Sequence, residues 1–184
     1  RYRCANQGSL NPGNPPGGID LEKAQTQSWS RRNSPLLTNS PPPKPWMKSG
    51  LYCPRVIFAN GKYRMWFMAT PVRPTLLQVQ VGYAESEDGI HWQRKGITCI
   101  DFKSLDEHSI ARPYVLKDNG TYKMWYSYRE QQYVNTYRTG YAESTDGLEW
   151  ERKDNLMEHF DVSDEGWDSE MICYPLVFDH KGKR

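Results

Sequence analysis

A long internal repeat constrains this chain more than any other feature. Residues 82–95 read GYAESEDGIHWQRK and residues 140–153 read GYAESTDGLEWERK, with 10 of 14 positions identical. A second pair of matching segments, 60–67 and 119–126, lies upstream of these copies, and a third pair begins at Pro54 and Pro113. Self-similarity at a period of about 60 residues indicates duplication of one structural unit. The chain is therefore expected to fold as an array of similar sheets.

Each unit is predicted to contain four antiparallel strands. The predicted strands are 54–59, 62–69 and 79–85 in the first unit and 113–118, 121–128 and 137–143 in the second, with Trp92 and Trp150 on the fourth strands. Asn-Gly pairs at Asn60 and Asn119 join the first two strands, because both turn residues must tolerate a positive φ. Asp-Gly pairs at Asp88 and Asp146 join the last two. Four such strands per repeat are typical of a β-propeller blade.

We therefore predict an all-β fold, an incomplete propeller over residues 26–184. Its full blades are expected at about 46–95 and 105–153, and the start of a third at about 167–184, where Pro175 begins the unit again. Trp29 matches the fourth-strand tryptophans and is expected on the outer strand that closes the ring. Residues 1–25 contain a Pro/Gly tract and are predicted to be disordered.

Composition excludes several classes of protein. No apolar run approaches the roughly 18–20 residues that span a bilayer, so no membrane-spanning helix is predicted. The net charge of +2 comes from 24 basic and 22 acidic side chains, a balance that argues against nucleic acid as a partner. The mean hydropathy is low at −0.85, yet the chain has 7 Trp and 12 Tyr. Amphipathic aromatic rings suit the binding of sugars as well as packing.

The four cysteines do not have the close spacing of a metal site. They are Cys4, Cys53, Cys99 and Cys173. Free thiols are the favoured interpretation, and a structural disulfide is the alternative. We predict no metal site and no cofactor.

The most strongly repeated residues are predicted to be structural. In Ser86-x-Asp88-Gly89 and Ser144-x-Asp146-Gly147 the polar side chains can accept backbone N–H bonds within the turn. The tryptophan four residues after each aspartate is expected to pack against a neighbouring blade. Glu85 and Glu143 hold matching positions on the third strands and are expected to form salt bridges.

Function is expected where the repeats diverge, in the segments that lead into the first strand of each blade. Ligands of propellers bind near the central channel, at the ends of the innermost strands. The three segments before Pro54, Pro113 and Pro175 bring polar and aromatic candidates to this place. The candidate catalytic residues are Asp106, Glu107, Asp168 and Glu170, and the candidate substrate-binding residues are Trp46, His108, Arg112 and Trp167.

This set of side chains suits the chemistry of a glycosidic bond. One carboxylic acid protonates the leaving oxygen while an opposing carboxylate, about 5–9 Å away, attacks the sugar or activates water. A neighbouring Arg or His would separate the two pKa values. The alternative interpretation is that these are solvated loop acids which cap strands and turns.

The motifs Asn-Gly-x-Tyr-x-Met-Trp and Gly-Tyr-Ala-Glu-Ser-x-Asp-Gly-x-x-Trp-x-Arg, together with the preceding Pro-x-Val, resemble the five-bladed propeller superfamily of glycoside hydrolases. That group includes arabinanases, β-xylosidases, invertases, levansucrases and mannoside phosphorylases. Residues 167–175 are similar to a bacterial branch that occurs beside polysaccharide-assembly genes. The resemblance implies a five-bladed propeller of roughly 300 residues, so this chain is expected to be its N-terminal part.

The resemblance also implies three carboxylates, one from each of the first three blades. The segment before Pro54 supplies Met47, Lys48 and Ser49 instead, so the match is incomplete. The leading hypothesis is an enzyme that acts on an oligo- or polysaccharide, with Glu170 or Asp168 as the acid and Asp106 or Glu107 as its partner. The alternatives are a propeller that binds glycans without catalysis and one that binds proteins. A Ca²⁺ held by His108 and Asp106 is a further alternative raised by the resemblance.

Overall fold

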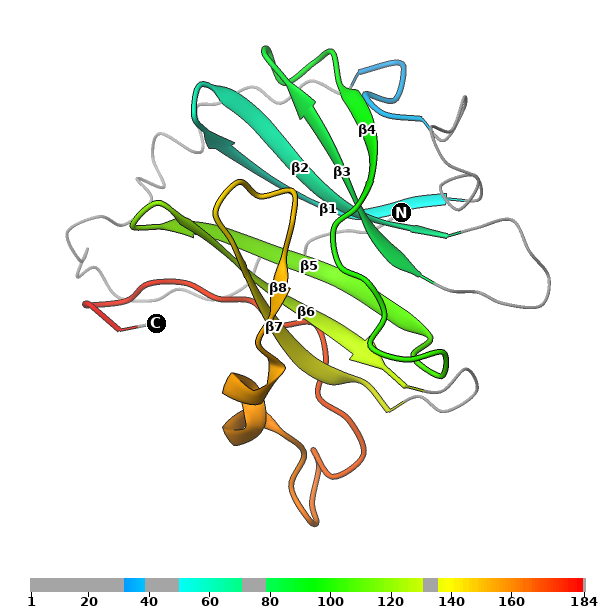
Figure 1. Cartoon of the computed structure of the whole chain (residues 1–184), viewed down its shortest axis with the longest axis vertical. Helices are drawn as coiled ribbons and strands as arrows, with labels where there is room; N and C mark the ends of the chain where they lie inside the picture. The colour runs from blue at the N-terminus through cyan, green and yellow to red at the C-terminus, as the bar shows by residue number, and fades with distance from the viewer. Residues whose placement is uncertain (1–31, 39–49, 71–78, 131–135, 184) are drawn as a thin grey trace, which may run out of the picture. The chain divides into compact units, whose positions relative to one another are not determined.

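The computed structural model describes residues 32–38, 50–70, 79–130 and 136–183 (Figure 1). The chain divides into two compact units, residues 1–34 and residues 35–184. Only the bend at 32–34 is described in the first unit, and all the strands belong to the second. The predicted disorder at 1–25, the closing strand at Trp29 and the candidate Trp46 lie outside the described residues. None of the helices in the described ranges has the length and apolar character needed to cross a membrane.

Two four-stranded antiparallel sheets form the second unit, which confirms the all-β prediction. The first sheet contains β1 (Gly50–Ala59), β2 (Lys62–Thr70), β3 (Gln80–Ser86) and β4 (Gln93–Thr98), in that order. The second contains β5 (Ser109–Asp118), β6 (Thr121–Arg129), β7 (Arg138–Ser144) and β8 (Glu151–Arg152), also in chain order. A short 3₁₀ helix, η2 (Asp154–Phe160), follows β8. Figure 1 shows the sheets as two similar layers, with β5 facing β1.

The turns that organise each sheet were predicted correctly. Asn60, Gly61, Asn119 and Gly120 all have positive φ, as this hairpin turn requires. The Ser-x-Asp-Gly turns are closed by the hydrogen bonds that the sequence suggested. Asp146 Oδ1 accepts from the backbone N–H of Leu148 at 2.8 Å, and Ser144 Oγ accepts from the N–H of Gly147 at 2.8 Å. Glu85 and Glu143 form salt bridges with Lys95 and Lys153, both at 2.7 Å.

The strands differ from the sequence prediction in three ways. β1 and β5 begin four residues before the predicted starts, because their ladders continue through a bulge at the proline. Trp92 and Trp150 precede β4 and β8 instead of lying on them, since their indole N–H groups bond back to the turns at Gly89 and Gly147. The strand expected at Pro175 is extended chain without a ladder, because among the described residues no strand pairs with it.

Trp66 of β2 packs against the second sheet and hydrogen-bonds to it. Its side chain is fully buried, and its indole N–H donates to the Gly147 carbonyl oxygen at 2.9 Å. The ring packs against Tyr122 and, edge to face, against Trp150, both with centroids 6.0 Å away. Arg64 of the same strand donates to the Asp146 carbonyl oxygen at 2.6 Å. The turn of the second sheet is therefore a docking point for the central strand of the first.

The matching tryptophan of the second sheet, Trp125 on β6, points the other way from the first sheet. Its neighbours Met124 and Tyr126 face the first sheet and join the buried core between the sheets. Because side chains alternate along a strand, Trp125 lies on the opposite face. The second sheet thus presents Met124 and Tyr126 to the first sheet and Trp125 to the far side.

Candidate functional site

The residue directly before each repeated proline adopts a strained backbone conformation. Cys53, Arg112 and Tyr174 have φ values of +50°, +53° and +64°. A positive φ is uncommon for residues other than glycine, and a following proline further disfavours a helical conformation. In β1 and β5 this position coincides with the bulge, where the pairing register shifts. The same distortion therefore occurs three times, although the three residue types differ.

These pre-proline side chains meet at one place. Two cavities of about 290 Å³ each lie beside the first strands, and Cys53, Arg112 and Tyr174 line both of them. The Arg112 guanidinium lies over the Tyr174 ring, 4.5 Å from its centroid. Tyr52 and Tyr137 add two more aromatic rings to one cavity. Sequence reasoning identified Arg112 but missed Cys53, Tyr174 and Tyr137, and the one signal for the first two is their position before the repeated proline.

A series of ring, cation–π and hydrogen-bond contacts connects this place to the predicted residue His108. The Tyr137 ring lies between the Tyr174 ring, 5.8 Å away, and the Arg129 guanidinium, 5.4 Å away. Arg129 Nη2 approaches Nδ1 of His108 at 3.1 Å. The backbone N–H of Tyr174 donates to Ser127 Oγ at 2.7 Å, which holds the segment before Pro175 against β6. Polar and aromatic groups of β6, and of the residues directly before β5 and β7, therefore gather at the same end of the second sheet.

His108 itself is buried and electrically neutral. Because a guanidinium can only donate, Nδ1 accepts and the ring proton resides on Nε2. Burial, and then the positive charge of Arg129, lower the pKa of His108 below its usual value. Its Nε2 atom is buried and has no hydrogen-bond partner among the residues that the structure describes. His108 is thus an unsatisfied donor next to the candidate site.

Glu107 differs from the other three predicted catalytic carboxylates because it is buried in an ion pair. Arg152 donates to both of its carboxylate oxygens, at 2.7 and 2.8 Å, and the Lys103 backbone N–H adds a third bond at 2.7 Å. Arg152 also pairs with Asp154 at 2.9 Å. Burial would raise the pKa of Asp154, but Lys103, Tyr126 and Arg152 outweigh it and hold that pKa below its usual value. The geometry favours a role for Glu107 in holding the second sheet to its connecting loop.

The remaining candidates lie on exposed or half-buried loops. Asp106 and Glu170 are exposed, and Trp167 is 96% exposed. Asp168 is half-buried and accepts from Ser163 Oγ at 3.0 Å. The Glu170 carbonyl oxygen accepts from Arg138 at 3.1 Å. Within the described ranges, no hydrogen bond joins two of these carboxylates, and a catalytic role for any of them remains a prediction.

The topology nevertheless brings the two acidic loops to one end of the second sheet. The His108 N–H donates to the Arg129 carbonyl oxygen at the end of β6. The Ile172 N–H donates to the Tyr137 carbonyl oxygen at the start of β7. Since β6 ends where β7 begins, Asp106 and the 168–170 segment lead into the same edge. Tyr137, which lines one of the two pre-proline cavities, lies at this same end of the sheet.

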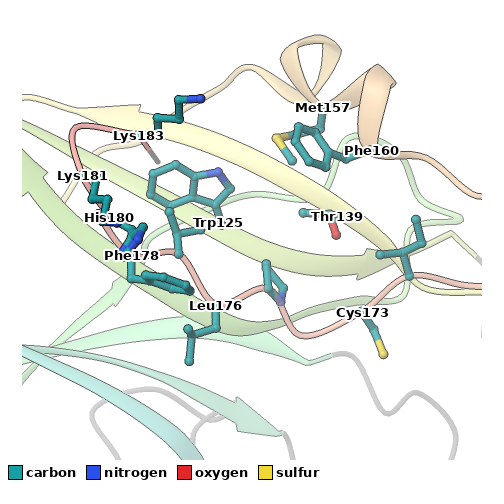
Figure 2. Close-up of a pocket in the computed structure, with 13 residues that line it drawn as sticks. Trp125, Thr139, Met157, Phe160, Cys173, Leu176, Phe178, His180, Lys181 and Lys183 are labelled. Atoms are coloured by element: carbon teal, nitrogen blue, oxygen red, sulfur yellow. The ribbon is translucent and has the colours of Figure 1, made fainter. Parts of the chain in front are cut away.

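A larger apolar groove lies on the far face of the second sheet (Figure 2). It has a volume of about 980 Å³ and is centred on Trp125. Met157 and Phe160 of η2 and Leu176 and Phe178 of the C-terminal segment complete its wall. Phe160, Leu176 and Phe178 are each more than 60% exposed. The groove around Trp125 on the second sheet matches the surface around Trp66 on the first sheet, which the second sheet covers.

No cluster of three His, Cys, Asp or Glu side chains suited to a metal ion occurs within residues 32–38, 50–70, 79–130 and 136–183. The candidate calcium ligand His108 uses Nδ1 as an acceptor for Ser109 and Arg129. Cys53, Cys99 and Cys173 are free thiols.

Comparison with known proteins finds relatives by sequence and by fold. No protein-family model matches the chain. A Mycobacterium tuberculosis protein of uncharacterised function, Rv1502, is 41% identical over 138 residues, which cover 71% of this chain and 43% of that protein. A 1,2-β-oligomannan phosphorylase from a Thermoanaerobacter species is 25% identical over 118 residues, 61% of this chain and 40% of that protein.

A solved glycoside hydrolase structure has the same fold. It superposes with a TM-score of 0.65 over 82% of this chain and 45% of its own length, at 18% identity. The chain spans less than half the length of the curated relatives it matches.

Proposed function

We propose that the two sheets are the first two blades of a five-bladed propeller and that residues 167–184 begin the third. The repeated sheet and the repeated tryptophan support this assignment. Trp66 is covered by the second sheet, and Trp125 occupies the matching place in an apolar groove of about 980 Å³. A third blade in that groove would bury Trp125 as the second blade buries Trp66.

We infer that the protein acts on the glycosidic bond of an oligosaccharide, at the end of the blades where the first strands begin. The observation that carries this proposal is the convergence of three strained pre-proline side chains on shared cavities lined by aromatic rings. Strained residues other than glycine cluster at functional sites, where the fold keeps them despite their cost. Tyrosine rings in a shallow cavity provide faces for the apolar side of a sugar.

The acid and base would come from the loops that lead into this edge. Asp106 precedes β5, while Asp168 and Glu170 precede the Tyr174 segment, so the two loops can present carboxylates to opposite sides of one bond. Glu107 is assigned to the scaffold because both of its oxygens are engaged by Arg152. Glycan binding without catalysis is the second candidate, favoured by the absence of carboxylates among the described residues that line the two cavities.

The test is a product assay on the full-length protein with a panel of oligosaccharides, with and without inorganic phosphate. Glycan turnover is expected, and Glu170→Gln, Asp168→Asn or Asp106→Asn should reduce it by at least 100-fold without weakening substrate binding. Glu149→Gln is the matched control, since Glu149 is exposed on the Asp146 turn outside the site. Binding without turnover would support the second candidate. No binding and no turnover would contradict both and favour a protein-binding propeller.

A further inference from the structure

Arg112 is the one charged residue among the three that line both cavities. Its φ of +53° belongs to a conformation that is unfavourable for a residue with a side chain. Glycine or asparagine would adopt this φ at lower cost. The chain therefore has a long cationic side chain at a backbone position that favours glycine or asparagine. That mismatch indicates that the side chain itself is needed.

The guanidinium of Arg112 is placed to bind a ligand. Its Cζ lies over the Tyr174 ring, 4.5 Å from the centroid, a cation–π contact that leaves its N–H groups available to a ligand. It makes no hydrogen bond or ion pair with any other residue that the structure describes. The side chain is also exposed at the surface of the cavities. Arg112 thus presents donors to solvent without an internal acceptor.

The surroundings favour a negatively charged group. Arg55 lines one cavity with Arg112 and is itself stacked on Tyr114 at 4.1 Å. Its Nε donates to the Val115 carbonyl oxygen, so Arg55 is fixed in place. None of the described residues that line either cavity carries a carboxylate. The cavities therefore combine a positive potential with aromatic faces.

We propose that Arg112 and Tyr174 form a subsite for the carboxylate of an acidic sugar, so that the glycan recognised by this protein contains a uronic acid. A guanidinium matches a carboxylate in a planar, two-bonded geometry, and the flanking tyrosine rings would hold the pyranose ring. Arg55 is held through Nε by the Val115 carbonyl oxygen, so Arg112 is assigned the direct contact with the carboxylate and Arg55 the supporting positive charge. The inference rests on the proposed carbohydrate function and specifies its substrate class.

The experiment measures binding to the full-length protein by calorimetry. The probes are uronic acid oligosaccharides, the same oligosaccharides with each carboxylate reduced to an alcohol, and inorganic phosphate. The wild-type protein is expected to prefer the acidic form. Arg112→Asn should weaken binding of the acidic form by about 10- to 100-fold and leave the reduced form unchanged. Asparagine tolerates a positive φ, so this variant should fold as the wild type does.

Lys117→Gln is the matched control. It removes the same charge from the same strand, at an exposed position near the other end of β5. It should leave both affinities unchanged. Equal losses for the acidic and reduced forms in Arg112→Asn would overturn the uronic acid subsite while leaving glycan binding intact. Phosphate binding that depends on Arg112 and competes with the acidic sugar would overturn it as well. Absence of binding to every glycan would instead reject the proposed function.

Discussion

Substituting Glu107 by glutamine separates the two roles that this carboxylate could have. The sequence predicts a catalytic acid or base, whereas the structure buries the side chain to 2% exposure against Arg152. Glutamine keeps the size of the side chain and one acceptor oxygen. Its amide group would face a donor, either the Arg152 guanidinium or the Lys103 N–H. At least one of the three hydrogen bonds is therefore replaced by a contact between two donors.

The expected cost follows from this geometry. Removing one partner of a buried ion pair destabilises a protein by about 3–5 kcal/mol. Arg152 keeps Asp154 at 2.9 Å and lies 5.4 Å from the centroids of both the Tyr126 and the Tyr128 ring, so its charge stays partly compensated. We therefore expect the lower end of the range, about 3 kcal/mol of unfolding free energy.

Urea unfolding of the full-length protein, followed by tryptophan fluorescence, measures this loss. Glu85→Gln is the control, because Glu85 pairs with Lys95 at a 20% exposed position of the first sheet and should cost less than about 1 kcal/mol. If Glu107→Gln keeps the stability of the wild type but abolishes turnover of a glycan, the structural assignment is wrong and Glu107 is catalytic.

Two further predictions concern the sheet interface and pH. Trp66→Phe removes the hydrogen bond from the indole N–H to the Gly147 carbonyl oxygen and should lower the free energy of unfolding in urea by about 2–3 kcal/mol. In the full-length protein Trp125→Phe should lower it by a similar amount. If Trp125→Phe leaves the stability unchanged, this result would argue against a third blade that covers Trp125. Because burial and Arg129 lower the pKa of His108, the unfolded chain takes up a proton below about pH 6.5 that the folded chain does not. The free energy of unfolding should therefore fall as the pH drops below about 6.5. His108→Asn should flatten that part of the curve of stability against pH. If the variant has the same curve as the wild type, His108 does not titrate as described.

The repeat made most of the fold predictable from the sequence. Hairpin turns at Asn60 and Asp88, and their copies at Asn119 and Asp146, are local features whose residue types directly determine their backbone geometry. The boundaries at the prolines were harder to predict. A proline predicts the start of a strand because it has no backbone N–H to donate. In β1 and β5 the strand continues through the proline, since a bulge at this position leaves the proline out of the ladder.

The candidate site was only partly predictable. Arg112 and His108 lie in the divergent segment that the repeat alignment pointed to. The role of Glu107 depends on Arg152, 45 residues later, and the packing of Arg152 against two tyrosine rings follows from tertiary structure alone. The positive φ shared by Cys53, Arg112 and Tyr174 could not be predicted from their residue types either, because the three side chains differ in size, charge and polarity.

A crystal structure of the full-length protein with a bound acidic oligosaccharide tests the central claim most directly. The account predicts a sugar in the cavities between Cys53, Arg112 and Tyr174, with its carboxylate on the Arg112 guanidinium and a pyranose ring against Tyr174 or Tyr137. Asp106 and the 168–170 loop should flank the adjoining glycosidic bond. A sugar bound at another place, with Arg112 paired to an acidic side chain of the protein itself, would contradict the account.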